Sequence, residues 1–242
     1  FFFFFSVKTW FARIICMLFL FAISAMRAFS QLFTYTRTYT VQDGLAQNSV
    51  NGILKGDEGL IWLISKDGLS LFDGYEFRNF KASSEILKRS VSNQFLSLKK
   101  DGCGCLWILN DIGQVLRFNP KNEQFELFPS AEENRGLFYF STSSWTQISP
   151  NELWLLGANA TGAIRLTMDE NCNVVLKRFC EETSSHSGCN VRSVVPDHSG
   201  RRWILTDRGV WFLNAQDSVL NEYNIHTARN NSVYSMIETP NE

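Results

Sequence analysis

The chain has 242 residues, of which 45% are hydrophobic and 14% aromatic, and its formal net charge is −1 at pH 7. That length suits one large domain or two small ones with a buried core. The near-neutral charge argues against a surface that binds nucleic acid through its phosphates, because such a surface is strongly basic.

Residues 1–30 are expected to direct export and to lie outside the fold. Lys8 and Arg13 precede a run of ten apolar residues, and the small residues Ala28 and Ser30 precede a suitable cleavage point. The apolar run is short for a membrane span. We therefore expect a cleaved signal peptide, with an uncleaved signal anchor as the alternative. A run of phenylalanines without an initiator Met opens the chain, which is typical of translated upstream sequence.

Four tryptophans recur at nearly equal spacing through the rest of the chain. They stand in apolar runs at intervals of 45, 47 and 49 residues: Trp62, Trp107, Trp154 and Trp203. Three of them are followed six residues later by a glycine: Gly68, Gly113 and Gly209. A period of this length, built from short apolar runs, is typical of β-propeller blades. These residues are expected to be structural anchors, with the tryptophans packing between blades rather than stacking on sugars.

Each unit holds four short runs separated by turn residues, which is the composition of a four-stranded propeller blade. In the first unit the runs cover residues 50–55, 60–64, 69–72 and 75–80. The four units are expected at about 48–80, 90–128, 139–179 and 190–225. The third departs most from the pattern, because Gly162 comes two residues late after its tryptophan.

The two ends of the array decide its architecture. Residues 231–237 resemble 48–53, so a fifth blade is expected to begin within 231–242. Residues 33–39 are β-rich and are expected to take the place of a fourth strand, with closure of a ring as one role. The sequence therefore predicts an all-β fold over 31–242, with about four propeller blades and the start of a fifth in an incomplete ring. A closed ring of four blades is the alternative.

The cysteines do not form an evident framework. Outside the signal segment there are five, an odd number: Cys103, Cys105, Cys172, Cys180 and Cys189. One residue between the first two is too few for a mutual bridge. The pairing stays open, and turn and core cysteines with one bridge among the last three are the favoured interpretation. The three histidines are scattered, so the sequence predicts no metal site and no cofactor.

Several of these motifs are similar to those of a known repeat. Residues 43–45 (Asp-Gly-Leu), 48–50 (Asn-Ser-Val), 59–62 (Gly-Leu-Ile-Trp) and 67–72 (Asp-Gly-Leu-Ser-Leu-Phe) resemble the two-component regulator propeller repeat. That repeat fills the periplasmic sensor regions of hybrid two-component histidine kinases, most familiar in Bacteroidetes. The resemblance covers about residues 33–242, closely in the first unit, well in the second and fourth, and partly in the third.

The resemblance implies a role in signal transduction. In that family the propellers are followed by an immunoglobulin-like domain, a membrane helix and the kinase core. It therefore implies a periplasmic sensor region of an inner-membrane protein, exported by a signal peptide. It also implies a homodimer at full length and downstream sensor, membrane and kinase domains of the same parent chain as partners. This segment holds no kinase motif, so it is not itself expected to be an enzyme or to bind nucleic acid. Gly56, where the family usually has Asp, departs from the repeat.

The expected geometry of a propeller places two sets of loops on one face. If the first strand of each unit is innermost, the loop leading into it and the loop between the second and third strands share that face. Amides, guanidinium groups and carboxylates on rigid loops are suited to bind hydroxyls or acidic sugars. The candidate ligand-binding residues are Gln47, Asn48, Lys66, Asp67, Arg89, Asn110, Asp111, Asn190, Asp207 and Arg208. The alternative for each is a solvated turn residue.

No catalytic residue is predicted. Asp101 and Asp197, each six residues before a tryptophan, are expected to bond the amides of their turns rather than to act as acids. Motifs for an activated serine, a zinc hydrolase or a phosphate-binding loop do not occur. The sequence therefore predicts a non-catalytic, ligand-sensing propeller that responds to an oligosaccharide. The alternatives are an exported binding or interaction module and a secreted propeller polysaccharide lyase.

Overall fold

The computed structural model describes most of the chain between residues 36 and 223. The described residues are 10, 15–19, 36–57, 59–85, 87, 90–128, 142–157, 162–179, 189–207 and 209–213, with the backbone of 220–223. The chain divides into two compact units, Phe1–Thr38 and Tyr39–Glu242. In the first unit residues 15–19 are helical. Among the described helices none has the length and apolar character needed to cross a bilayer. Most of the predicted signal segment lies outside the described residues.

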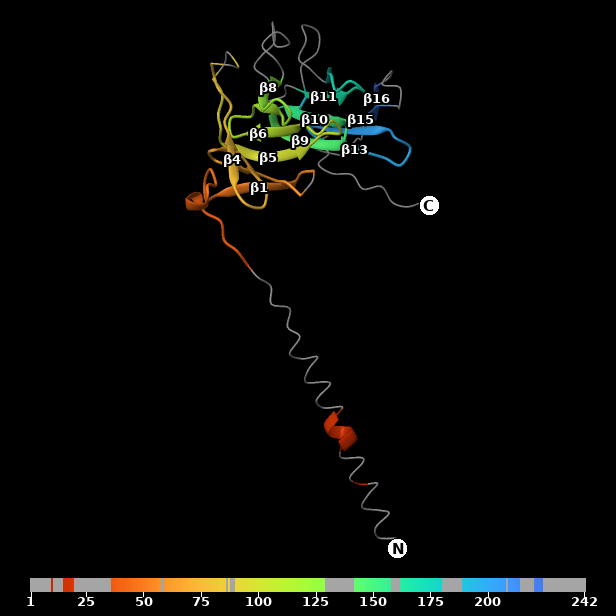
Figure 1. Cartoon of the computed structure of the whole chain (residues 1–242). Helices are drawn as coiled ribbons and strands as arrows, with labels where there is room; N and C mark the ends of the chain where they lie inside the picture. The colour runs from red at the N-terminus through yellow and green to blue at the C-terminus, as the bar shows by residue number, and fades with distance from the viewer. Residues whose placement is uncertain are drawn as a thin grey trace. The chain divides into compact units, whose positions relative to one another are not determined.

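The second unit contains four antiparallel sheets, each made of four consecutive strands (Figure 1). The first sheet is β1 (Val50–Lys55), β2 (Ile61–Ser65), β3 (Gly68–Phe72) and β4 (Phe77–Phe80). The second is β5 (Phe95–Lys100), β6 (Leu106–Asn110), β7 (Val115–Asn119) and β8 (Gln124–Phe128). The third is β9 (Thr142–Ser149), β10 (Glu152–Gly157), β11 (Ala163–Met168) and β12 (Val174–Phe179). The fourth is β13 (Val191–Pro196), β14 (Arg202–Thr206), β15 (Gly209–Leu213) and β16 (Leu220–Tyr223).

In every sheet the spatial order of the strands follows the chain, which is the meander of a propeller blade. The predicted all-β propeller class is confirmed. The backbone conformation explains why a glycine follows the second strand, since Gly68 has a φ of 117°. A Cβ there would lie 2.6 Å from the Phe80 carbonyl oxygen, so only glycine fits the turn from β2 to β3.

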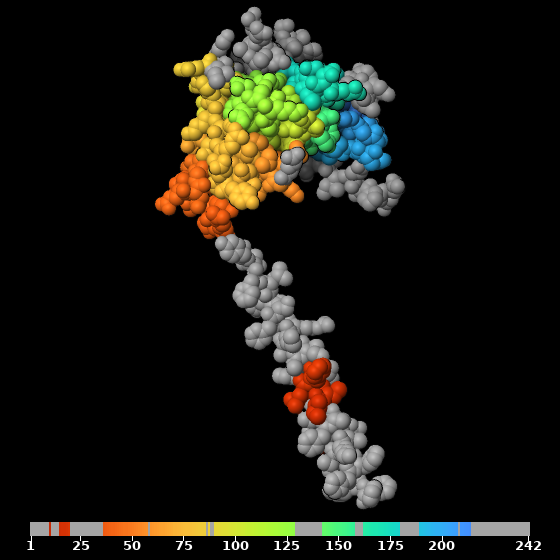
Figure 2. Space-filling model, in the orientation of Figure 1, coloured from red at the N-terminus to blue at the C-terminus, as the bar shows by residue number. Residues whose placement is uncertain are grey.

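The core lies between consecutive blades in three clusters. In each cluster the anchor tryptophan of one blade packs against apolar side chains of the next: Trp62 on the second blade, Trp107 on the third and Trp154 on the fourth. Figure 2 shows the second blade, yellow to green, between the first and the third. No cluster of the described residues joins the first blade to the fourth, so this part of the chain is an open array.

The segment before the first blade differs from the prediction of a strand over residues 33–39. Residues 36–40 are not in a strand, and 33–35 lie outside the described residues. Thr40 instead caps the short 3-10 helix η1 (Val41–Asp43), and its backbone N–H donates to the Asp43 carboxylate at 2.8 Å. Tyr39 packs its ring edge against Phe72 at 4.8 Å between centroids. The polar groups of Thr40 and Asp43 are used locally, and residues 36–40 do not add a strand to the blade.

Candidate functional site

The two predicted loop sets are joined by backbone hydrogen bonds. In the second blade the Asp111 N–H donates to the Gln94 carbonyl at 3.0 Å. In the fourth the Asp207 N–H donates to the Asn190 carbonyl at 3.1 Å. In both blades the loop between the second and third strands therefore contacts the loop leading into the first. Because these loops share a face, their exposed side chains form a common surface.

Asn190 and Asp207 are brought together by the fourth blade. The Asn190 backbone N–H donates to Asp207 Oδ1 at 3.0 Å, and its Nδ2 donates to Oδ2 at 2.8 Å. Both residues are partly buried. Their two hydrogen bonds to each other therefore replace contacts that water would otherwise make. The pair fixes the loop shape before any ligand arrives.

Asn110 lies under the predicted face rather than on it. Its side chain is buried, and Nδ2 donates to the Ser92 carbonyl at 3.0 Å and to Gln114 Oε1 at 2.9 Å. The Gln114 backbone N–H donates to Asn110 Oδ1 at 2.8 Å. Both donors of the Asn110 amide are thus used inside the loop, and this residue holds the surface in place.

The remaining predicted residues differ in how far their side chains are already used in hydrogen bonds or ion pairs. Asn48 Oδ1 accepts the Val41 N–H at 2.8 Å, and Gln47 Oε1 accepts the Ser49 N–H at 3.1 Å. Asp67 pairs with Lys81 at 2.6 Å. Lys66 and Asp111 have exposed side chains, whereas Arg89 and Arg208 lie outside the described residues. Lys66, Asn48 and Asp111 are the most open of the predicted contacts.

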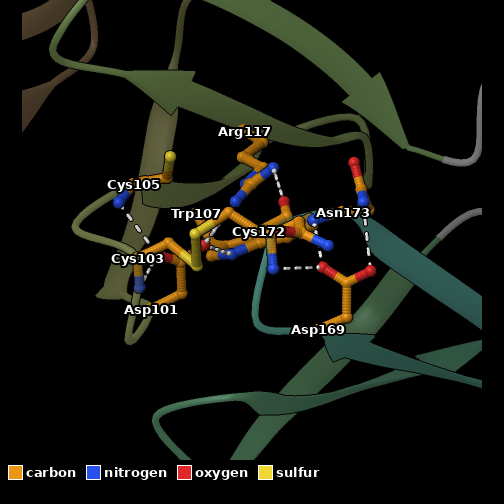
Figure 3. Close-up of a disulfide and its surroundings, with 9 residues drawn as sticks. Asp101, Cys103, Cys105, Trp107, Arg117, Asp169, Cys172 and Asn173 are labelled. Atoms are coloured by element: carbon orange, nitrogen blue, oxygen red, sulfur yellow. Dashed lines mark hydrogen bonds and ion pairs between the residues drawn. A yellow bond between two sulfur atoms is a disulfide. The ribbon is translucent and has the colours of Figure 1, made fainter.

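A second polar arrangement lies beneath the anchor tryptophans, on the side of the blades away from those loops. Asp101 Oδ1 accepts the N–H groups of Cys103 at 3.0 Å and Cys105 at 2.8 Å (Figure 3). Its Oδ2 accepts the indole N–H of Trp107 at 3.0 Å and Arg117 Nη2 at 3.1 Å. The Asp101 side chain is fully buried. The prediction that Asp101 bonds its turn is confirmed, and Trp107 and Arg117 are two further partners of its carboxylate.

The second and third blades are covalently joined beside this carboxylate. Cys103 forms a disulfide with Cys172, with 5.8 Å between Cα atoms, and Arg117 Nη1 donates to the Cys172 carbonyl at 3.2 Å (Figure 3). The preference for a bridge confined to the last three cysteines is therefore wrong for Cys172. Packing of the third blade on the second brings two distant turns together, which spacing along the chain does not reveal.

The other cysteines differ in their bonding state. Cys189 is disulfide-bonded, and Cys180 lies outside the described residues. Cys105 is a free, buried thiol. Burial raises its pKa, so it is a poor nucleophile at neutral pH.

Glu152 takes the role of the indole acceptor in the third blade, although it stands two residues before Trp154 rather than six. Its carboxylate accepts the Trp154 N–H at 2.8 Å, forms an ion pair with Arg165 at 3.0 Å, and is hydrogen-bonded by Arg202 of the fourth blade. Burial raises the Glu152 pKa, but hydrogen bonds from Arg202 and Trp154 and the two nearby arginine charges outweigh it and lower the pKa. Sequence reasoning missed this residue, whose only indication is an acid at the start of an apolar strand.

Asp197 repeats the Asp101 arrangement in the fourth blade. Oδ1 accepts the Ser199 and Arg201 backbone N–H groups at 2.9 and 3.0 Å, and Oδ2 accepts the Trp203 indole at 2.9 Å. Burial raises its pKa, but the hydrogen bonds from Ser199, Trp203 and Arg201 outweigh it and lower the pKa. Like Asp101, it is a turn-bonding carboxylate, as predicted.

No group of three or more His, Cys, Asp or Glu side chains in the described residues is arranged to hold a metal ion. The buried carboxylates of the second, third and fourth blades are each bonded to an indole and an arginine. Their chemistry is that of structural links between strands and blades.

No protein-family model matches this chain, and no curated protein matches it. Solved structures of similar fold include the extracellular domains of two hybrid two component systems of B. thetaiotaomicron. One, BT3049, is 16% identical with a TM-score of 0.49, over 85% of this chain and 26% of that one. The other, BT4673, is 14% identical with a TM-score of 0.42, over 77% and 31%. Virginiamycin B lyase from Staphylococcus aureus is 11% identical with a TM-score of 0.46, over 74% and 56%. The chain thus spans about a quarter to just over half of these proteins, and at such identities the likeness concerns the fold.

Proposed function

We propose that this chain is the N-terminal, periplasmic sensor segment of a hybrid two-component histidine kinase. The observation that carries the proposal is the motif resemblance of the first unit, whose residues form one folded segment. Gly44, with φ 101°, ends η1, and Leu45 is buried with 6% exposure. Asn48 then bonds back to Val41. The Asp-Gly-Leu and Asn-Ser-Val motifs therefore act together to begin the propeller.

The ligand in this proposal is an oligosaccharide. Lys66, Asn48 and Asp111 are exposed on loops whose shape is fixed by internal hydrogen bonds. A rigid polar surface suits hydroxyl groups, because little side-chain entropy is lost when they bind. Signalling would follow from a shift between two arrangements of a sensor dimer, biased by the difference in ligand affinity.

A non-catalytic role is supported by the use of the buried acids. Asp101 and Glu152 each bind an indole and at least one arginine, so their carboxylate oxygens are occupied. A lyase needs an acid and a base that reach the substrate. In the described residues Asp101 bonds only groups of its own blade, and Glu152 bonds groups of its own blade and Arg202 of the next.

Two experiments test the proposal. The intact gene should continue in frame beyond Glu242 into further repeats, a membrane helix and kinase motifs, and a stop codon directly after Glu242 would contradict it. The purified protein should bind members of a glycan panel without changing them. Turnover of a bound glycan would favour the lyase, and binding of protein but no glycan would favour an interaction module.

A further inference from the structure

The first blade lacks a buried ion pair that the second blade has. Trp107 is paired across the strands with Arg117, whereas Trp62, at the equivalent register, is paired with Leu71. Directly paired residues on adjacent strands point to the same side of the sheet. Leu71 therefore lies where the guanidinium group of Arg117 lies in the second blade.

The acid of that ion pair is also missing. Gly56 stands six residues before Trp62, the position that Asp101 holds before Trp107. The two turns are alike, since the Gly56 N–H donates to the Leu60 carbonyl at 2.8 Å and the Asp101 N–H to the Cys105 carbonyl at 2.9 Å. A Cβ at Gly56 would lie 3.0 Å from Trp62 Nε1, so the indole N–H points at the place of the absent carboxylate.

The indole of Trp62 is thereby left without its usual acceptor. Trp107, Trp154 and Trp203 each donate to a carboxylate of their own blade. Within the described part of the chain no residue accepts the N–H of Trp62. Trp62 as a whole is 5% exposed, and the indole N–H of a largely buried tryptophan usually has a partner.

A hollow of about 250 Å³ opens at this side of the first blade. Its walls are two leucines, two acids and an arginine: Leu60, Leu71, Asp73, Glu76 and Arg78. Arg78 is the cross-strand partner of Leu71 and reaches Glu123 of the second blade at 2.5 Å. The hollow is therefore continuous with the Trp62 face and bordered by the contact between two blades.

We propose that this hollow is a binding pocket for an uncharged, hydroxyl-rich ligand of about the size of one sugar residue. The leucines offer apolar surface to the C–H face of a sugar ring, and the acids accept hydrogen bonds from hydroxyls. Trp62 lies beside these walls, since its cross-strand partner Leu71 is one of them. The pocket rests on the proposed sensing function and gives it a second, specific place to bind a glycan.

The charges of the walls select against an acidic ligand. Asp73 and Glu76 contribute two carboxylates, and the one guanidinium group, that of Arg78, is already paired with Glu123. An anion would meet two like charges and no free cation, which disfavours it. The pocket therefore differs from the loop face, whose chemistry also suits acidic sugars.

The test fills the pocket with the side chains that the second blade uses. Gly56→Asp with Leu71→Arg restores the missing ion pair beside Trp62, and Leu71→Arg alone fills the hollow without the close contact at Gly56. Leu96→Arg, the same change at an exposed leucine of the second blade, is the matched control. Each full-length variant is first checked for an unchanged thermal transition. Binding is then measured by saturation-transfer difference NMR with neutral hexoses and pentoses, glucuronate, and neutral oligosaccharides.

We expect at least one neutral sugar to bind the native protein more strongly than glucuronate does. Both filled variants should weaken that binding at least about tenfold, and Leu96→Arg should not. If the filled variants bind the sugars as strongly as the native protein does, the proposed pocket is wrong, but the sensing function is not contradicted. If oligosaccharides bind but no single sugar does, and the filled variants bind them as well as the native protein, the pocket is again overturned and the sensing function stands. If neither single sugars nor oligosaccharides bind, the glycan-sensing function fails together with the pocket.

Discussion

The anchor tryptophans show how one requirement is met by different residues. The N–H of a large indole that packs between blades is usually hydrogen-bonded, and in three blades a carboxylate accepts it. Asp101 and Asp197 reach it from six residues upstream, and Glu152 reaches it from two. The chemistry of the site is constant although the position of the acid is not. Only the first blade, with Gly56, leaves this site empty among the described residues.

Asp197 is expected to make the fold sensitive to acid. Its folded pKa lies below the ordinary value of 3.8, so its carboxylate stabilises the protein above that value. This stabilisation is lost as the pH falls through 3.8 toward the folded pKa. Asp197→Asn should lower the free energy of unfolding by about 1–3 kcal/mol at pH 7, because two turn N–H groups and the Trp203 indole lose a charged acceptor. The difference between native and variant protein should shrink by pH 3.

Urea denaturation at pH 7, 5 and 3 measures this difference. Asp111→Asn removes an exposed carboxylate of the same charge and is expected to cost little at pH 7. An Asp197→Asn deficit that is as large at pH 3 as at pH 7 would show that the lost contacts do not depend on the ionised carboxylate.

At the scale of the elements, the turns between the third and fourth strands tie the second and third blades each to the blade before it. Glu123, between β7 and β8, pairs with Arg78 of β4. Cys172, between β11 and β12, is bridged to Cys103. Both turn residues are non-glycine residues with positive φ, 58° and 65°. Left-handed backbone at such residues is uncommon, and here it occurs where a turn reaches a neighbouring blade.

The disulfide should be the strongest of these links. Cys103 and Cys172 are 69 residues apart, so their bridge restricts a long loop of the unfolded chain. Replacing both by serine should lower the free energy of unfolding by about 3–5 kcal/mol. Chemical denaturation of the oxidised protein measures the loss, and Cys105→Ser, which removes a free thiol from the adjoining turn, is the matched control. A double variant as stable as this control would mean that the ion pairs and core already hold the two blades together.

Seen as a whole molecule, the blade array is predictable from sequence, but the contacts between blades are not. The tryptophan period and the glycine turns are local patterns, so they indicated the propeller class without long-range information. The Cys103–Cys172 bridge and the pairing of Glu152 with Arg202 join residues of different blades. They depend on how blades stack, which no spacing in the chain records. The adjacency of the two loop sets follows from the topology of a blade, whereas the burial of Asn110 depends on a side-chain network with Gln114.

The blades stack in one direction, because the anchor tryptophan of each of the first three blades packs against the blade that follows it in the chain. Trp62, Trp107 and Trp154 each face the following blade and are 5%, 1% and 0% exposed. Trp203 holds the same register in the fourth blade, paired across the strands with Phe212, but is only half-buried. The face that carries it is the one that a following blade covers elsewhere in the molecule. Residues 231–242, predicted from sequence to begin such a blade, lie outside the described residues.

This difference in burial should appear in the energetics of two equivalent tryptophans. Trp154→Ala should lower the free energy of unfolding by about 3–5 kcal/mol, because it leaves a large cavity between two blades. Trp203→Ala should cost clearly less, since that side chain is less completely buried than Trp154. Each variant also removes one indole–carboxylate hydrogen bond, to Glu152 or to Asp197, so the polar loss is similar and the difference reports packing. Urea denaturation of both variants in the full chain measures it. An equal cost at Trp203 would mean that this face is covered in solution, either by the residues that follow the fourth blade or by a second copy, and sedimentation of the native protein would distinguish the two.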